Sequence, residues 1–196
     1  MNLDTLDTKS RIILVTMDMI GSKGNIDLTI REIAQEANVN IASINYYFGS
    51  KDNLFYEVEK RFVDDIGAIY EILFKDGESY KERLIQWATS LMTYLINYPG
   101  IIFMWAARLI NDKTQNQGIV ELIASSESNL NHIVKGLTQI DDDEQVIFKI
   151  MQLISGIINP VIIYQGVGSH MGVDISDDNI RSKYVISLIE SVICKV

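Results

Sequence analysis

The stretch "TIREIAQEANVNIASINYYFGSKDNLF", residues 29–55, decides the fold of the N-terminal region. Thr29 and Glu32 have the spacing of a capping box, in which each side chain accepts a hydrogen bond from the backbone N–H of the other residue. We therefore expect a helix at residues 30–37. Asn38 tolerates the left-handed conformation that lets a chain turn sharply. Asn40 is expected to cap a further helix through its side-chain oxygen, and Gly49 to end it.

These two short helices and the turn between them predict a helix-turn-helix. Ile41, Ile44 and Phe48 recur at helical spacing and predict an inward-facing stripe. The residues expected to face outward are Ala42, Ser43, Asn45 and Tyr46, with Tyr47 partly so. Small side chains let the helix backbone approach base edges in the major groove, and tyrosine hydroxyls can reach phosphates. An ordinary helical corner with surface tyrosines is the alternative that the pattern leaves open.

Helical periodicity extends over almost the whole chain, so the predicted fold class is all-α. A first helix is expected at residues 9–21, and a fourth, capped by Ser50, is expected to run to about residue 74. Further helices are expected at residues 80–97, 100–111, 117–137, 142–166 and 177–195. The predicted domains are a three-helix helix-turn-helix domain at residues 1–50 and a larger helical domain at residues 51–196.

Charge argues against nonspecific binding to nucleic acid. The net charge is −9, and the first 60 residues hold six Lys or Arg against nine Asp or Glu. Specific binding through a few well-placed donors and helix N-termini stays compatible with this balance. The single cysteine, Cys194, fits a reducing compartment, and the acidic N-terminus carries no secretory signal, so a cytoplasmic location is expected.

Two stretches of 24 residues, 84–107 and 150–173, contain no Lys, Arg, Asp or Glu and are long enough to span a bilayer. Each contains a proline and several polar side chains. Helices buried in a bundle or in a subunit interface explain them better than membrane spans, and no membrane association is expected. A membrane-embedded helical protein is the alternative.

Residues 29–55 resemble the DNA-binding region of the TetR family of bacterial transcriptional regulators, and "INYYFGSKDNLF" is close to that family's signature. The specific match covers about residues 11–55, with Asn38 where the family usually has glycine. The resemblance implies a homodimer that binds a palindromic double-stranded DNA operator and a small-molecule effector, more often as a repressor than as an activator. It also implies that the recognition helices, residues 41–47, enter successive major grooves about 34–36 Å apart.

Carried over position by position, the resemblance assigns DNA contacts. Thr29, Arg31 and Lys51 would contact backbone phosphates. Residues in or beside the major groove would be Asn40, Ile41, Ala42, Ser43 and Asn45, with Tyr46 and Tyr47 on phosphates or base edges.

In this family the last two long helices would form the dimer interface. The helix at residues 142–166 carries apolar side chains around too much of its circumference for a helix with one buried face. The interface residues expected from it are Ile147, Ile150, Met151, Ile154, Ile158 and Val161. Gly156 could allow a close helix crossing. A central helix of a monomeric bundle is the alternative.

An effector pocket is expected among the helices between residues 62 and 137. The candidate lining residues are Trp87, Met92, Tyr94, Phe103, Met104, Trp105 and Arg108. Such an aromatic and methionine stripe also suits plain core. Arg108 could meet a ligand carboxylate or phosphate, an internal acid such as Glu121 or Glu71, or solvent.

A helical enzyme is the competing class, but the sequence offers little for catalysis. His132 and His170 lack metal-ligand spacing, and no glycine-rich phosphate loop or nucleophile elbow is present. We therefore expect no catalytic residues, no metal and no cofactor.

Overall fold

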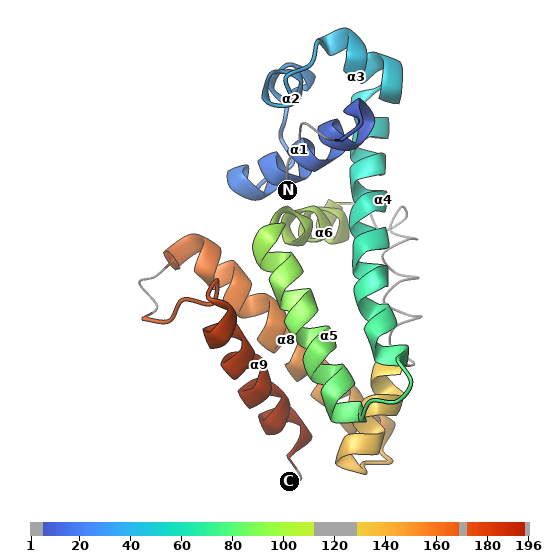
Figure 1. Ribbon diagram of the computed structural model, residues 1–196, viewed down its shortest axis with the longest axis vertical. Coiled ribbons are helices and arrows are strands. Elements are labelled where there is room, and N and C mark those ends of the chain that lie inside the picture. The colour runs from blue at the N-terminus through green and yellow to red at the C-terminus, as the bar shows by residue number, and fades with distance from the viewer. Residues whose placement is uncertain (1–5, 112–128, 169–171, 195–196) are drawn as a thin grey trace. The chain divides into compact units, whose positions relative to one another are not determined.

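The computed structural model describes residues 6–111, 129–168 and 172–194, and every regular element in these ranges is helical (Figure 1). The chain divides into two compact units. The first contains the residues up to Asp65 together with the segment that begins at Tyr98, and the second contains Ile66–Asn97 and the described residues from 129 onward.

The first unit is built from α1 (Thr8–Lys23), α2 (Ile30–Glu36), α3 (Ile41–Phe48), most of α4 (Lys51–Tyr70) and α6 (Gly100–Asn111). Asp7 caps α1, and Gly24, with φ 66°, ends it in the left-handed conformation. Ser50 caps α4 by accepting a hydrogen bond from Asn53 N at 3.1 Å. The core is apolar and includes Ile12, Met17, Ile20, Leu28, Ile33, Ile44, Leu54, Val58 and Phe62.

Two glycines bring α1 and α6 into close contact within this unit. A Cβ on Gly100 would lie 2.7 Å from the backbone nitrogen of Gly21, and one on Gly21 would lie 3.1 Å from Pro99. Phe103 of α6 packs against Gly24 at the end of α1. The predicted domain boundary after residue 50 was based on the helix-turn-helix only. The first compact unit extends further along α4 and also includes α6, because the glycine contact joins that later helix to α1.

The second unit contains the last residues of α4, the 3₁₀ helix η2 (Glu71–Phe74), α5 (Tyr80–Asn97), a helical segment at residues 129–138, α8 (Asp143–Val167) and α9 (Asp178–Ile193). The predicted helices match these bounds closely, except that the helix expected at 117–137 begins outside the described residues. α5 packs on both α8 and α9. Gly156 allows α8 to approach α9, since a Cβ there would lie 2.5 Å from Leu188 Cδ1, and Tyr184 donates a hydrogen bond to the Gly156 carbonyl at 2.6 Å.

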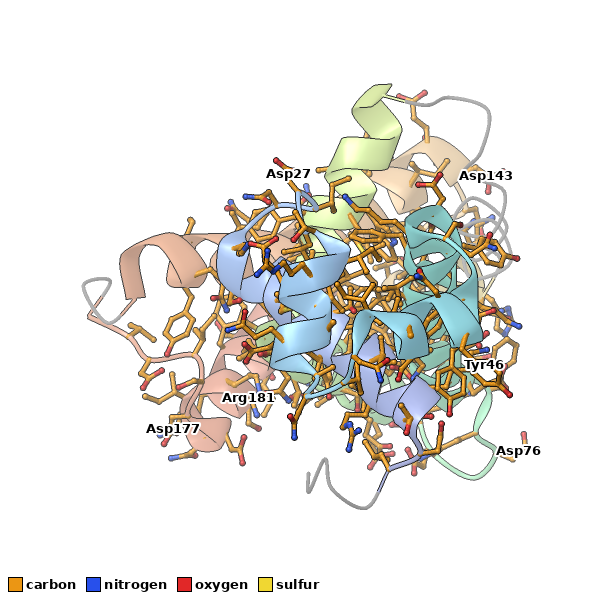
Figure 2. All side chains as sticks on the ribbon, turned by 90° about the horizontal axis from the view of Figure 1, so that it is seen from above. Asp27, Tyr46, Asp76, Asp143, Asp177 and Arg181 are labelled. Atoms are coloured by element: carbon orange, nitrogen blue, oxygen red, sulfur yellow. The ribbon has the colours of Figure 1, made fainter. Side chains whose placement is uncertain are left out.

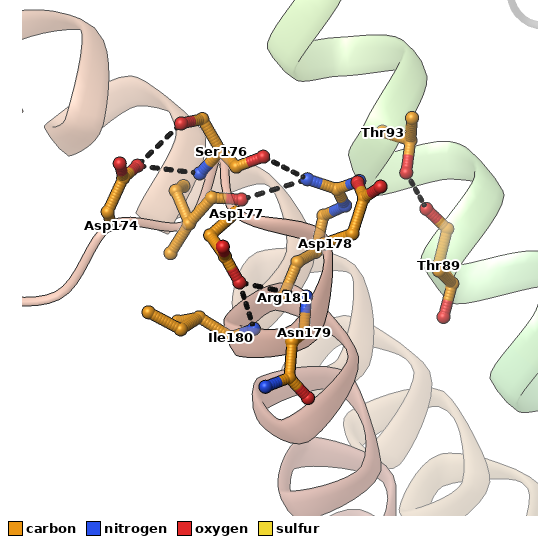
Figure 3. A network of polar contacts seen from close by, with 10 residues as sticks. Thr89, Thr93, Asp174, Ser176, Asp177, Asp178, Asn179, Ile180 and Arg181 are labelled. Carbon is orange, nitrogen blue, oxygen red and sulfur yellow. Dashed lines mark hydrogen bonds and ion pairs between the residues drawn. The ribbon is translucent and has the colours of Figure 1, made fainter.

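Arg181 near the start of α9 is a buried charge in this unit, with 5% of its surface exposed. Its guanidinium donates to the carbonyls of Ile175 and Ser176 at 3.1 and 3.0 Å and also pairs with Asp178 (Figure 3). Asp177 caps the helix by accepting from Asn179 N and Ile180 N. Arg181 thus fixes the loop before α9 onto the helix itself.

α8 meets the length and composition test for a membrane-spanning helix, and it is the one such helix in the described ranges. Only 22% of its apolar stretch is buried within the chain. The same composition suits a helix that is covered by a second subunit. Pro160 lies within α8, as expected from the sequence.

Candidate nucleic-acid interface

α2 begins with the predicted capping box. Thr29 Oγ1 accepts from Glu32 N at 3.2 Å, and Glu32 Oε2 accepts from Thr29 N and from the Thr29 hydroxyl, both at 2.7 Å. A contact that the sequence did not predict extends this box, because Lys23 Nζ lies 2.6 Å from Glu32 Oε1. The hydrogen bond from Lys23, followed by those from Thr29, lowers the pKa of Glu32 from its ordinary 4.5 to about 2.

The turn between α2 and α3 has the predicted geometry. Asn38 takes a φ of 52°, and Val39 N donates to the Ala34 carbonyl at 2.9 Å. Asn40 Oδ1 then caps α3 by accepting from Ser43 N at 2.7 Å and from the Ser43 hydroxyl at 2.9 Å. The left-handed conformation of Asn38 and the two hydrogen bonds accepted by Asn40 fix the direction in which α3 leaves the turn.

α3 presents a mixed outer face to solvent. Ile44 and Phe48 are 0% and 5% exposed and form its inner side. The predicted inner position of Ile41 is wrong, because this first residue of the helix lies beyond the core and is 45% exposed. Ala42 and Asn45 are exposed, and Ser43 is half-buried.

Two tyrosines dominate the exposed surface of α3. Tyr46 is 82% exposed and Tyr47 40% exposed, and their rings meet edge to face with centroids 5.1 Å apart. Tyr46 projects outward from the end of α3 (Figure 2). Exposed aromatic side chains are costly to keep in water, and such surfaces commonly serve recognition.

The hydrogen bonds separate the predicted contact residues into two groups. Thr29, Asn40 and Ser43 are engaged in capping, and the Thr29 hydroxyl proton is held by Glu32. Within the described residues, the side chains of Arg31, Asn45 and Tyr46 form no hydrogen bond and remain able to donate outward. A phosphate contact in which the Thr29 hydroxyl donates its proton would require the bond that this hydroxyl donates to Glu32 Oε2 to break.

The basic side chains of this region divide in the same way. Lys9 pairs with Glu57 at 3.0 Å, and Lys23 pairs with Glu32. The ammonium of Lys51 lies 5.4 Å from the ring centroid of Phe55, and neither Lys51 nor Arg31 has an acid partner in the described part of the chain. Arg31 and Lys51 thus remain available to an external anion, and their contact with phosphate stays a prediction.

The residues predicted for an effector pocket fall in both compact units. Trp87, Met92 and Tyr94 lie on α5 in the second unit, with the first two fully buried. Phe103, Met104 and Trp105 lie on α6 in the first unit, where Met104 is buried. The side chain of Arg108 lies outside the described residues. Their shared role in one pocket stays a prediction.

The predicted interface residues on α8 also separate. Ile147 and Met151 are 40% and 60% exposed, and Ile150, Ile154 and Ile158 are half-buried. Val161 is a correction, because it is fully buried within the chain and has no surface to offer a partner. Phe148 and Ile163, which were not expected at the interface, are exposed on the same helix, as is Ile162 of its apolar run. The apolar character of these side chains was the signal in the sequence that could have identified them as interface candidates.

The sequence of the chain is similar to a family of regulatory proteins and to individual curated regulators. Residues 12–58 match the model of the family described as bacterial regulatory proteins, tetR family. The regulator BetI of Brucella abortus is 32% identical over 65 residues, which cover 33% of each chain. The probable regulator YttP of Bacillus subtilis is 30% identical over 95 residues, covering 47% of this chain and 46% of that one. The matched region thus spans between a third and a half of these curated relatives.

Solved structures match over nearly the full length. A TetR transcriptional regulator from Legionella pneumophila has a TM-score of 0.71 at 23% identity and covers 97% of this chain and 98% of its own. PfmR from Thermus thermophilus has a TM-score of 0.73 at 17% identity, covering 98% of both chains. FadR from Bacillus subtilis, solved in complex with stearoyl-CoA, has a TM-score of 0.68 at 18% identity and covers 95% of this chain and 98% of its own. These likenesses establish the fold.

Proposed function

Because the N-terminal domain belongs to the TetR family of bacterial regulatory proteins and the whole chain has the fold of solved members, we propose that the protein is a sequence-specific, DNA-binding transcriptional regulator. The observation that carries the proposal is the outer face of α3. It combines exposed Ala42, Asn45 and Tyr46, and the neighbouring helices α2 and α4 carry Arg31 and Lys51, which have no acid partner among the described residues.

The chemistry of this face suits recognition of a duplex. Asn45 can form paired hydrogen bonds with an adenine edge, and Ile41 can contact a thymine methyl group. Arg31, Lys51 and the tyrosine hydroxyls supply donors for phosphates, which set the register but carry no sequence information. The alternative is that the helix-turn-helix is only a structural corner. That interpretation is less favoured, because it leaves the exposed tyrosine pair unexplained.

The protein acts as a homodimer in this proposal, and α8 supplies the contact. Five large apolar residues among the described side chains of α8 are exposed within the single chain: Ile147, Phe148, Met151, Ile162 and Ile163. An apolar surface of this kind marks an interaction site. A twofold dimer places two α3 helices on two half-sites of a palindrome, one helical turn apart.

A small-molecule effector that binds the helical domain would release the operator, and the protein would act in the cytoplasm as a repressor. Support comes from the fold, since the FadR structure holds stearoyl-CoA in a protein of this architecture. By linkage, effector and DNA then weaken each other's binding by the same factor. α4 contributes residues to both compact units, so its tilt is the coupling element that we propose.

The test is fluorescence anisotropy of the purified protein with duplexes that tile the DNA upstream of its own gene. Tight binding to one palindromic duplex, lost in Tyr47→Ala, is the expected result. Equal, weak and salt-sensitive binding to every duplex, unchanged by the substitution, would exclude α3 as the element that reads DNA.

A further inference from the structure

Aromatic and polar side chains lie close together in the second unit, where α4 ends and α5 begins. Figure 1 shows the ends of these two helices. The ring of Tyr70 contacts the indole of Trp87 at a centroid distance of 5.3 Å, and the ring of Tyr80 packs on Gly136 of the helical segment 129–138. Arg83 lies on α5 between Tyr80 and Trp87, one helical turn before Trp87. These residues form a cluster, the Arg83–Trp87 site, that the proposed DNA-binding function does not use.

Trp87 presents a buried hydrogen-bond donor without an acceptor. The residue is 0% exposed, and no atom of the described residues accepts from its Nε1–H. Buried tryptophans usually find a partner for this group, because an unmade bond there leaves the desolvation cost uncompensated. The orphaned N–H therefore indicates an acceptor that the described residues do not supply.

Arg83 presents a second such donor on the same side of α5. Residues four apart on a helix are neighbours on its surface. Arg83 NH1 donates to the Leu73 carbonyl at 2.9 Å, and its guanidinium lies 4.8 Å from the ring centroid of Tyr80. Its Nε–H is buried and has no acceptor, and no carboxylate among the described residues pairs with this charge.

The neighbouring phenols do not neutralise the arginine. Burial raises the pKa of Tyr70 to about 12, so this side chain stays uncharged at neutral pH. The Tyr80 hydroxyl is 2.7 Å from His132 Nε2 and is already engaged there. The rest of the buried face of α5 is apolar, with Leu84, Ala88 and Leu91. The cluster thus combines an arginine without a carboxylate partner among the described residues, two buried donors one helical turn apart on α5, and apolar surroundings.

We infer that the effector of the proposed function is an organic acid with an apolar body, whose carboxylate accepts hydrogen bonds from Trp87 Nε1 and Arg83 Nε. To call this acid the effector depends on the proposed function, whereas the site itself is inferred from the contacts described above. A carboxylate has the lone pairs to satisfy both donors and the charge to pair with a guanidinium. The apolar part of the acid would lie along the apolar face of α5.

Isothermal titration calorimetry on the full chain, without DNA, tests the inference with two matched pairs of probes. Octanoate is compared with octanamide, and 2-naphthoate with 2-naphthamide, so that each pair shares a shape and differs in charge. At least one acid should bind about tenfold or more tightly than its amide, the scale of a charge-assisted hydrogen bond. Equal affinities within both pairs, or binding by none of the four probes, would overturn the inference.

Variants locate the site. Arg83→Gln should abolish the preference for the acid, whereas Arg61→Gln, which removes an exposed arginine paired with Asp65, should leave it intact. Because Arg83→Gln also loses the bond to Leu73, Trp87→Phe provides a second test that removes the N–H and keeps an apolar ring. It should weaken binding of the acid severalfold while circular dichroism shows the native helix content. Unchanged acid binding in both variants would contradict the assignment.

Anisotropy with operator DNA separates this inference from the proposed function. If the acid binds through Arg83 and releases DNA, both stand. If it binds through Arg83 but leaves DNA binding unchanged, the site stands and its role as effector site is refuted. If the protein binds no DNA at all, the proposed function fails while the calorimetry still decides the site.

Discussion

Lys23 Nζ, at the last residue of α1, lies 2.6 Å from Oε1 of Glu32, the residue whose other oxygen closes the capping box of α2. One carboxylate therefore joins the end of α1 to the beginning of the helix-turn-helix. Both side chains are exposed to solvent, so the pair contributes modestly to stability, but it fixes the direction of α2 relative to α1.

This pair predicts a pH dependence of stability. The pKa of Glu32 is lowered in the folded chain from 4.5 to about 2, so the folded state favours the ionised form. The resulting stabilisation is complete above pH 4.5 and is lost as the pH falls from there towards 2. Glu32→Gln should thus flatten the fall in melting temperature over this range. The control is Glu36→Gln on the same helix, which should retain the wild-type slope; equal slopes in all three proteins would contradict the prediction.

Lys51 predicts a specific change in the salt dependence of DNA binding. Its ammonium has no acid partner in the described residues and is available to phosphate. Lys51→Ala should weaken operator binding by roughly 1–3 kcal/mol and flatten the slope of log K against log salt by about one unit for each subunit bound. Anisotropy titrations at several salt concentrations measure both quantities. Lys183→Ala on α9 is the charge-matched control, and an identical slope in the two variants would exclude a phosphate contact by Lys51.

Local signals in the sequence were reliable, whereas of the contacts between distant residues only the close helix crossing at Gly156 was expected. The Thr29 capping box, the left-handed Asn38 and the Asn40 cap each depend on neighbours within a few residues, and all three are present. The Lys23–Glu32 pair depends on how two helices pack, which periodicity does not encode.

Packing decided the one wrong prediction on α3 and two features for which the sequence made no prediction. Helical periodicity placed Ile41 inside, but this first residue of α3 is 45% exposed, and the buried side of the helix begins at Ile44. The close approach of Gly21 and Gly100 joins α6 to the first unit, although the two residues are far apart in sequence. Arg181 lies in the polar run "DDNIRSK", which is typical of a surface segment. Its burial cannot be seen in this pattern, because it arises only when the preceding loop folds onto α9.

Asn38 predicts an asymmetric response to substitution. With a φ of 52°, it occupies a conformation that glycine adopts freely and that β-branched residues avoid. Asn38→Gly should leave stability within about 0.5 kcal/mol and keep operator binding, whereas Asn38→Val should cost roughly 1–2 kcal/mol. Urea denaturation followed by circular dichroism measures the difference. If Val were tolerated as well as Gly, the strain assigned to this turn would be absent.

Met151 predicts the position of the dimer contact. It is 60% exposed on α8 within the single chain, so a carboxylate there does not disturb the subunit core. Met151→Glu should shift the protein towards monomer, because burying an unpaired charge in an apolar contact costs several kcal/mol. Sedimentation velocity at several concentrations reports the shift, with Lys75→Glu, in the loop after η2, as the control. A dimer of undiminished stability in Met151→Glu would remove this part of α8 from the interface.

Arg181 predicts a large loss of stability from a residue outside the DNA-binding region. Its guanidinium is buried and donates to the carbonyls of Ile175 and Ser176, which would be left without these bonds in Arg181→Ala. Removing a buried, hydrogen-bonded charge should lower the free energy of unfolding by about 2–4 kcal/mol. Lys183→Ala, two residues further along α9 and exposed, should cost less than about 0.5 kcal/mol. Chemical denaturation of both variants measures the difference, and similar losses would mean that the loop before α9 is held by its own caps at Asp174 and Asp177 rather than by Arg181.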